Sequence, residues 1–254
     1  MPSPNATTRF SDRVENYVRY RPGYPAEVLD VLRAETGLVP GQAVADVGSG
    51  TGISAKLFLD AGHPVYAVEP NAEMRAAAEA MLGDDERFHS VAGSAEATTL
   101  PDASVDYVVA AQAFHWFDPA AVGPEWRRIL RPGGWMVLLW NTRQTDTTPF
   151  LRAYEALLHE HGTDYASVNH ENVTADSLRA VLGGGYTRRM VPSAQVFDFE
   201  ALKGRLLSSS YAPNVDHPGH VPMLAALERI FNEHQQEGRV RFEYDTEIYF
   251  GRGD

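Results

Sequence analysis

The sequence predicts an α/β fold in which an open, mostly parallel sheet carries helices on both faces. Short apolar runs alternate with helical segments between residues 26 and 140, which is typical of such sheets. The run at 43–47 passes into a glycine-rich turn and then an amphipathic segment, as a strand, a tight turn and a helix do. The next run, 65–68, closes on the acid Glu69. Because ligands of open α/β sheets bind beyond the carboxyl ends of the strands, these two ends predict the ligand site.

Composition restricts the partners and the chemistry of the chain. Its 254 residues, of which 44% are hydrophobic, are enough for one well-buried domain with insertions or a small cap. The net charge of −12 disfavours nucleic acid, whose phosphates need Lys and Arg, and is otherwise explained by solubility. The absence of cysteine excludes disulfides, thiolate metal sites and cysteine nucleophiles, and the histidines lack metal-ligand spacing, so we predict no metal. No apolar run is long enough to span a membrane, and we expect a cytoplasmic protein.

A segment rich in proline and tyrosine precedes the first strand. Residues 20–25 read Tyr-Arg-Pro-Gly-Tyr-Pro, and a helical segment follows over 26–35. The Pro-Gly pair cannot continue a helix, and the tyrosine and arginine side chains can form hydrogen bonds, so we expect a stiff loop. Tyr17 and Tyr24 suit either contact with a ligand or packing of the first helix on the sheet, whereas Tyr20 and Arg21 favour a functional role.

The glycine turn carries the first specific signal. Three glycines at alternate positions, Gly48, Gly50 and Gly52, let the chain reverse sharply and let a ligand approach the backbone, and the following helix directs its free N–H groups at the same place. The dinucleotide pattern is G-x-G-x-x-G, whereas this turn is G-x-G-x-G and has Asp46 two residues before its first glycine. A carboxylate there would repel a pyrophosphate. It favours a ligand with an ammonium group, such as the amino-acid end of S-adenosylmethionine (SAM).

Helices and strands alternate after this turn. The next helix ends at residues 61–64, and the second strand ends at Glu69, whose carboxylate is placed to bind the two ribose hydroxyls of a nucleoside. NAD enzymes use the same device, so Glu69 becomes specific only in combination with Asp46. Asn71 is the predicted N-cap of a helix over 72–82. Strands are predicted at 88–91 and 105–110.

The second half of the chain shows less regular signals. A helix begins at Asp118-Pro119 and ends before Pro132-Gly133-Gly134, which cannot remain helical, and a strand follows over 135–140. Further helices are predicted at 150–161, 174–182, 202–210 and 221–236, and further strands at 186–199 and 239–250.

The residues from Asp46 to Gly52 resemble motif I of the class I SAM-dependent methyltransferases. Later stretches match the same family in order, among them 94–96, 100–101 and 130–134, and they resemble its small-molecule, type 11-like members. The resemblance implies a Rossmann-like seven-stranded sheet of order 3-2-1-4-5-7-6, with the last strand antiparallel, helices on both faces and a helical cap. It also implies a single domain over 1–254, in which 1–36 form a lid, 37–142 the SAM-binding core, and 143–254 the cap insertion and the last two strands.

The resemblance also implies which residues hold SAM. They are Asp46, Gly48, Ser49, Gly50, Gly52, Glu69, Pro70, Met74, Ser94, Ala95, Glu96, Ala111 and Gln112 in the core, and Tyr20 and Arg21 in the lid. The family frequently has a carboxylate at the position of Ser94, where it accepts from the adenine amino group, so here the adenine contact shifts to Ala95 and Glu96. Met74 suits either the adenine edge or core packing.

The loop after the fourth strand, 111–118, should border both the cofactor and the methyl acceptor. It lacks the Asn/Asp-Pro-Pro-aromatic motif of enzymes that methylate adenine or protein amides, so a small organic acceptor is expected, methylated by direct in-line displacement. The residues expected to contact it are Tyr17, Tyr20, His115, Trp116, Asn141 and Tyr211. His115 is either a general base or a structural residue of the loop.

Two other functions share these motifs. A non-catalytic SAM-binding protein would have the same turn and acids, and an NAD(P)-dependent oxidoreductase would share the sheet and Glu69, although Asp46 and the glycine spacing count against it. We expect a monomer or a homodimer.

Overall fold

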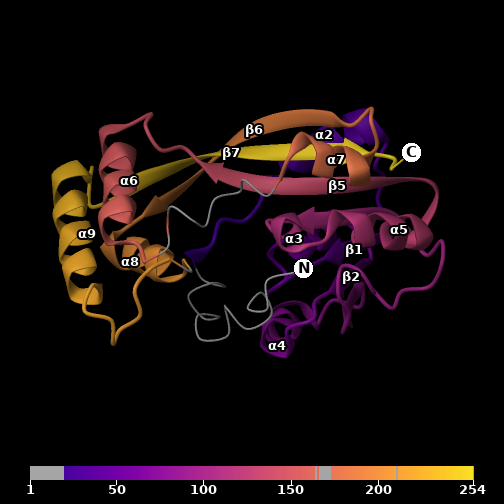
Figure 1. Cartoon of the computed structure of the whole chain (residues 1–254), viewed down its shortest axis with the longest axis horizontal. Coiled ribbons are helices and arrows are strands. Elements are labelled where there is room, and N and C mark those ends of the chain that lie inside the picture. Colours follow the sequence, from indigo (N-terminus) through magenta and orange to yellow (C-terminus); the bar gives the residue numbers. More distant parts are fainter. Residues whose placement is uncertain (1–19, 164, 166–172, 210, 254) are drawn as a thin grey trace.

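The computed structural model describes residues 20–163, 165, 173–209 and 211–253. Its centre is a sheet of seven strands in the order β3-β2-β1-β4-β5-β7-β6 (Figure 1). The strands are β1 (Val44–Val47), β2 (Val65–Val68), β3 (Phe88–Val91), β4 (Val105–Ala111), β5 (Leu130–Arg143), β6 (Thr187–Phe197) and β7 (Val240–Gly251). β7 lies between β5 and β6 and is antiparallel to both, while the neighbours from β3 to β5 pair in parallel. The strand order and the antiparallel last strand are confirmed.

Helices cover both faces of the sheet, as predicted. The helices are α2 (Glu27–Thr36), α3 (Ile53–Asp60), α4 (Ala72–Leu82), α5 (Pro119–Ile129), α6 (Pro149–His161), α7 (Ala175–Leu182), α8 (Phe199–Leu207), α9 (His220–His234) and the 3₁₀ turn η2 (Phe114–Trp116). α2 and α3 bury Leu32 and Phe58 against one face, and α5 and α7 bury Trp126 and Val181 against the other. None of the helices described here is long and apolar enough to cross a membrane.

A separate apolar core lies at one end of the sheet. Figure 1 shows α6, α8 and α9 gathered there, joined to the rest by the long strands β5, β6 and β7. Their apolar side chains enclose Phe242 of β7, whose ring meets Phe150, Tyr154 and Phe197 edge-on at centroid distances of 5.3, 4.8 and 5.4 Å. We call these three helices the helical cap. β5, β6 and β7 continue into the cap, so this end of the sheet reaches beyond the glycine turn.

Two predicted boundaries are wrong for local reasons. β6 ends at Phe197 and α8 begins at Phe199, because the Asp198 side chain accepts a hydrogen bond from the Ala201 N–H at 2.8 Å and caps the helix. β5 begins at Leu130, directly after α5, and not at Trp135. The residues 131–134 are accommodated where the pairing of β4 and β5 shifts register, so the Pro-Gly-Gly stretch forms a bulge within the strand.

Candidate functional site

The glycine turn joins β1 to α3 with all three glycines at positive φ, 69° at Gly48, 55° at Gly50 and 85° at Gly52. A Cβ at Gly48 would lie 2.8 Å from the Cβ of Ala113, so the turn packs closely against the loop after β4. Gly52 packs in the same way against Leu82 of α4. A Cβ at Gly50 would meet nothing within 4 Å. The side of the turn at Gly50 is therefore open to a ligand.

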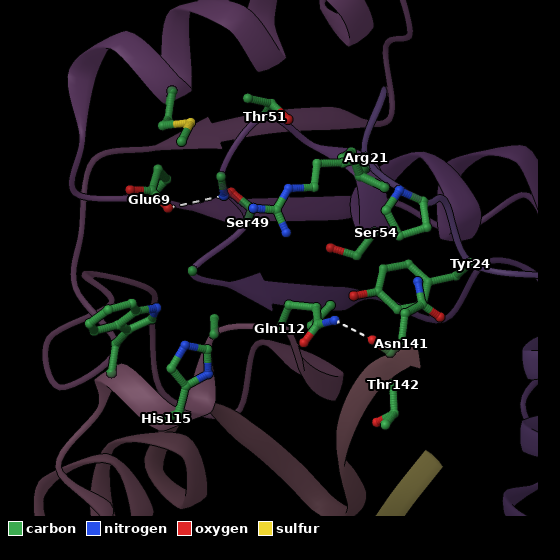
Figure 2. Close-up of a pocket in the computed structure, with 18 of the residues that line it drawn as sticks. Arg21, Tyr24, Ser49, Thr51, Ser54, Glu69, Gln112, His115, Asn141 and Thr142 are labelled. Carbon is green, nitrogen blue, oxygen red and sulfur yellow. Dashed lines mark hydrogen bonds between the residues drawn. The ribbon is translucent and has the colours of Figure 1, made fainter. Parts of the chain in front are cut away.

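Glu69 ends β2 beside this turn. One of its carboxylate oxygens accepts a hydrogen bond from the Gly50 N–H at 3.0 Å (Figure 2), and the other accepts from the Asn71 N–H at 2.9 Å. Burial raises the pKa of Glu69 above its usual value, and the two backbone N–H groups partly oppose that shift. Each carboxylate oxygen can accept a further hydrogen bond, which suits the paired hydroxyls of a ribose.

Asp46 lies in β1, fully buried beneath the turn. Its Oδ2 accepts a hydrogen bond from the Ser54 hydroxyl at 2.7 Å, and its Oδ1 has no hydrogen-bond partner within the described residues. Burial raises the pKa of Asp46 to about 7, the Ser54 hydrogen bond opposes this, and the nearby charge of Glu69 adds to it. The charge of this carboxylate therefore changes near neutral pH.

The open side of the turn faces a cavity of about 740 Å³. Most of the predicted site residues lie in its wall. They are Arg21, Gly48, Ser49, Gly50, Glu69, Pro70, Met74, Ser94, Ala95, Glu96, Ala111, Gln112, His115, Trp116, Asn141 and Tyr211. Asp46, Gly52 and Tyr20 are not part of the wall, although Ser54, the partner of Asp46, is. Tyr17 lies outside the described residues.

Tyr20 packs against the helical cap. Its ring lies so close to the backbone of α8 that a Cβ at Gly204 would be 2.1 Å from Tyr20 Cε2. Its carbonyl accepts a hydrogen bond from the Gln195 side chain of β6 at 3.4 Å. Tyr20 therefore joins the segment before α2 to the cap, and its predicted contact with a ligand stays a prediction.

The loop after β4 is tied to β5 and to the segment before α2. Gln112 has φ of 54°, unusual for a residue other than glycine, and its side chain donates to the carbonyl of Asn141 at 2.9 Å (Figure 2). The Asn141 amide in turn donates to the Gly23 carbonyl at 3.0 Å and accepts from the Thr246 hydroxyl at 2.6 Å. These bonds join four chain segments beside the cavity, the loop after β4, β5, β7 and the segment before α2. The backbone strain at Gln112 is typical of functional sites.

His115 and Trp116 enter the cavity wall from η2. Their ring centroids are 4.8 Å apart, and Figure 2 shows His115 in the same part of the cavity as Gln112. The placement brings an ionisable ring into the cavity wall, on the loop that packs against Gly48. It is compatible with either role predicted for His115.

The cap and the chain segments beside it contribute wall residues that the sequence analysis did not predict, among them Arg143, Glu155, Tyr165, Arg205 and Tyr244. Arg143 forms an ion pair with Glu155 and donates to the Tyr165 hydroxyl at 3.2 Å. The sequence could have indicated Arg143 as a site residue, because it follows the predicted site residue Asn141 by two positions at the carboxyl end of a strand. For Arg205 the sequence offered no such signal, because its burial on α8 is a property of the fold.

Comparison with known proteins supports the same family. Residues 45–138 match the family model described as a methyltransferase domain. An uncharacterized methyltransferase of Mycobacterium tuberculosis is 43% identical over 134 residues, which are 53% of this chain and 52% of that protein, so the match spans about half of its length. An uncharacterized methyltransferase of Mycobacterium avium is 34% identical over 202 residues, which are 68% of this chain and 79% of that protein.

Solved structures share the fold. A structure from Anaeromyxobacter dehalogenans described as a type II methyltransferase has a TM-score of 0.67 at 22% identity, covering 92% of this chain and 98% of that one. A SAM-dependent methyltransferase from Geobacter sulfurreducens in complex with S-adenosylhomocysteine has a TM-score of 0.51 at 18% identity, covering 95% and 96%. The match to the Mycobacterium avium protein over most of its length excludes the oxidoreductase alternative. The chain belongs to the class I SAM-dependent methyltransferase family.

Proposed function

We propose that this chain transfers the methyl group of SAM to a small organic acceptor by direct in-line displacement, leaving S-adenosylhomocysteine (SAH). The observation that carries this proposal is the continuity of one cavity. It extends from Gly50 and Glu69, which suit a nucleoside, to Arg205 and Tyr211 of the cap region, which do not belong to the predicted cofactor set. We call the end beside Gly50 and Glu69 the cofactor half of the cavity, and the end beside Arg205 and Tyr211 the cap half. A donor and an acceptor can therefore lie in the same enclosure, as transfer between them requires.

The residues at the end of the cavity beside the glycine turn suit the chemical groups of SAM. Gly50 leaves room for close approach to the backbone, Glu69 has acceptor capacity for a ribose, and Asp46 has an unpaired buried oxygen within the described residues. SAM supplies a sulfonium methyl group that is already electrophilic. The protein then has to align the acceptor, exclude water and accept a proton where the acceptor carries one, for which His115 is the candidate base.

The size and lining of the cavity support a compact acceptor. A volume of about 740 Å³ must hold both the cofactor and the acceptor, whereas ligand pockets generally range from roughly 300 to 1,000 Å³ for one ligand. Trp116 and Tyr211 offer ring faces, and Asn141 offers a polar contact. The cytoplasmic location, the single-domain organisation with its lid, and the monomeric or dimeric state stay predictions of the sequence.

The decisive experiment is a turnover screen with the purified chain, SAM and a panel of small hydroxyl, amine and carboxylic acid compounds, with SAH release as the readout. We expect release with a subset of compounds and none without an acceptor. Calorimetry with SAH on the same sample separates two failures. Binding of SAH without turnover on any acceptor would indicate the non-catalytic SAM-binding alternative, and absence of binding would contradict the proposal altogether. Turnover only on tRNA, DNA or folded protein would overturn the acceptor class.

A further inference from the structure

Arg205 is a buried cation in the wall of the cavity. Its side chain belongs to α8, and the residue is only 7% exposed. The guanidinium donates through Nη1 to the Ser209 hydroxyl at 3.1 Å. Its Nε has no hydrogen-bond partner in the described part of the chain, and no carboxylate of the described residues forms an ion pair with it. The positive charge of Arg205 is therefore left without a counter-ion among the described residues.

The surroundings of Arg205 keep it charged. Burial acts to lower the pKa of the guanidinium, but the neighbouring oxygens of Tyr244, Tyr211 and Tyr154 outweigh it, and the pKa stays above its ordinary value. Arginine does not lose its proton in proteins. A buried charge is costly unless an opposite charge lies beside it. Tyrosine hydroxyls offer dipoles only, so the charge of Arg205 is solvated but not neutralised.

A second arginine of the cavity wall, Arg143 at the carboxyl end of β5, does have an anionic partner. Arg143 is paired with Glu155 and lies 5.1 Å from the centre of the Tyr154 ring. The pair Arg143–Glu155 adds no net charge to the cap half of the cavity. Arg21 reaches the same region, since it donates to the carbonyl of Ser208 at 3.0 Å, one residue before the partner of Arg205. Arg205 is therefore the buried cation at this end of the cavity that has no carboxylate partner among the described residues.

We propose that Arg205 binds a carboxylate of the methyl acceptor, so that the acceptor is a small carboxylic acid anchored at the cap end of the cavity. The planar guanidinium presents a fork of donors that matches the two oxygens of a carboxylate, and a single negative charge would neutralise the charge of Arg205. Tyr211, which shares the wall, can donate a further hydrogen bond to the same group, whereas the Tyr244 hydroxyl already donates to the Gln195 side chain at 3.0 Å. This inference rests on the proposed function and concerns the group that anchors the acceptor, whichever atom is methylated.

The test compares acids with their uncharged amides on the same protein. Glutarate, citrate and 3-phenylpropionate, with the corresponding amides, are titrated by calorimetry into the chain saturated with SAH. We expect at least one acid to bind tenfold or more tightly than its amide. Arg205→Gln should abolish this preference, and Arg205→Lys, which retains the charge without the fork, should retain part of it. Lys203→Gln removes a half-exposed cation from the same helix, outside the cavity, and should leave the preference unchanged.

The results distinguish this proposal from the proposed function. SAH affinity should stay within twofold of the wild-type value in every variant, because Arg205 lies in the cap half. If the wild-type chain fails to bind SAH, the methyltransferase proposal fails, and the same acid and amide titrations without SAH still test Arg205. The anchoring role is overturned if no acid binds, if acids and amides bind equally, or if Arg205→Gln retains the preference. Stronger binding of phenyl phosphate than of every acid would also overturn it. If Arg205→Gln does not fold, the wild-type and Arg205→Lys titrations decide.

Discussion

The ring of Tyr20 lies directly on the backbone of Gly204, so closely that a Cβ at position 204 would come within 2.1 Å of Tyr20 Cε2. This contact joins the segment before α2 to the helical cap across 184 positions of the chain. The same segment supplies Arg21 to the cavity wall and accepts a hydrogen bond from Asn141 at Gly23. Glycine at 204 is therefore required by close packing on a helix, where alanine would otherwise be preferred.

The first prediction is that Gly204→Ala reverses its effect when Tyr20 is removed. In the wild-type background the added methyl group clashes with the ring, and the free energy of unfolding should fall by roughly 1–3 kcal/mol. In the Tyr20→Ala background the clash is gone, and the better helix propensity of alanine should raise it by about 0.5–1 kcal/mol. Urea denaturation of the wild type, Gly204→Ala, Tyr20→Ala and the double variant measures both changes in the free energy of unfolding. Gly184→Ala, at an exposed position where a Cβ meets nothing within 4 Å, is the control. If Gly204→Ala changes the free energy of unfolding with the same sign in both backgrounds, the contact between Tyr20 and Gly204 is contradicted.

The second prediction concerns Glu69 and the ribose. Glu69→Gln replaces two charge-bearing acceptor oxygens by a neutral amide, so binding of SAH should weaken by about 1–3 kcal/mol. Calorimetry measures the loss, and thermal unfolding checks that the turn held by Gly50 and Asn71 survives. Glu73→Gln, at an exposed position in the first turn of α4, is the matched control and should bind SAH normally. Equal affinities of the Glu69 variant and the wild type would remove Glu69 from the site.

The third prediction follows from the raised pKa of Asp46, about 7 in the folded chain against an ordinary value of 3.8. Between these two values the folded state binds more protons than the unfolded state, so the free energy of unfolding decreases as pH rises through this window. Asp46→Asn cannot ionise. The variant should gain stability relative to the wild type by about 1.4 kcal/mol for each pH unit inside the window, and the difference should level off above it.

Urea denaturation without cofactor, at several pH values from 4 to 8, measures this difference. Asp60→Asn removes an exposed acid from α3 and controls for the loss of one carboxylate. Parallel stability curves for Asp46→Asn and the wild type would show that Asp46 does not titrate in the window. If Asp46 holds the ammonium group of the ligand, the affinity for SAH should also rise across the same window in the wild type and lose that dependence in Asp46→Asn.

The fourth prediction separates the two roles of His115. As a general base, it should be needed for turnover with whichever acceptor the screen identifies, and His115→Ala should lower kcat roughly a hundredfold or more while SAH affinity stays the same. As a structural residue, its loss should instead weaken SAH binding or lower the stability of the loop after β4, with kcat nearly retained. His89→Ala, at an exposed position on β3, is the control for both measurements.

Local patterns in the chain were enough to predict the cofactor half of the molecule. The three glycines take positive φ, Glu69 ends β2 beside them, and Asn71 caps α4 by accepting from the N–H groups of Glu73 and Met74 at 2.9 and 3.0 Å. Each of these features depends on residues within a few positions of one another, so residue type and spacing carry the information. The strand order came from the family resemblance, and the strand pairing confirms it.

The acceptor half depends on contacts between distant parts of the chain. Tyr20 meets Gly204, and Arg21 donates to the carbonyl of Ser208, across 187 positions. Arg205 reads in sequence as an ordinary residue of an amphipathic helix, and only the packing of α8 on the ends of β6 and β7 buries it beside a cavity and away from any described carboxylate. Burial, and with it the energetic cost of an unpaired charge, is a property of the assembled fold. No local pattern could therefore have distinguished this arginine from the exposed ones.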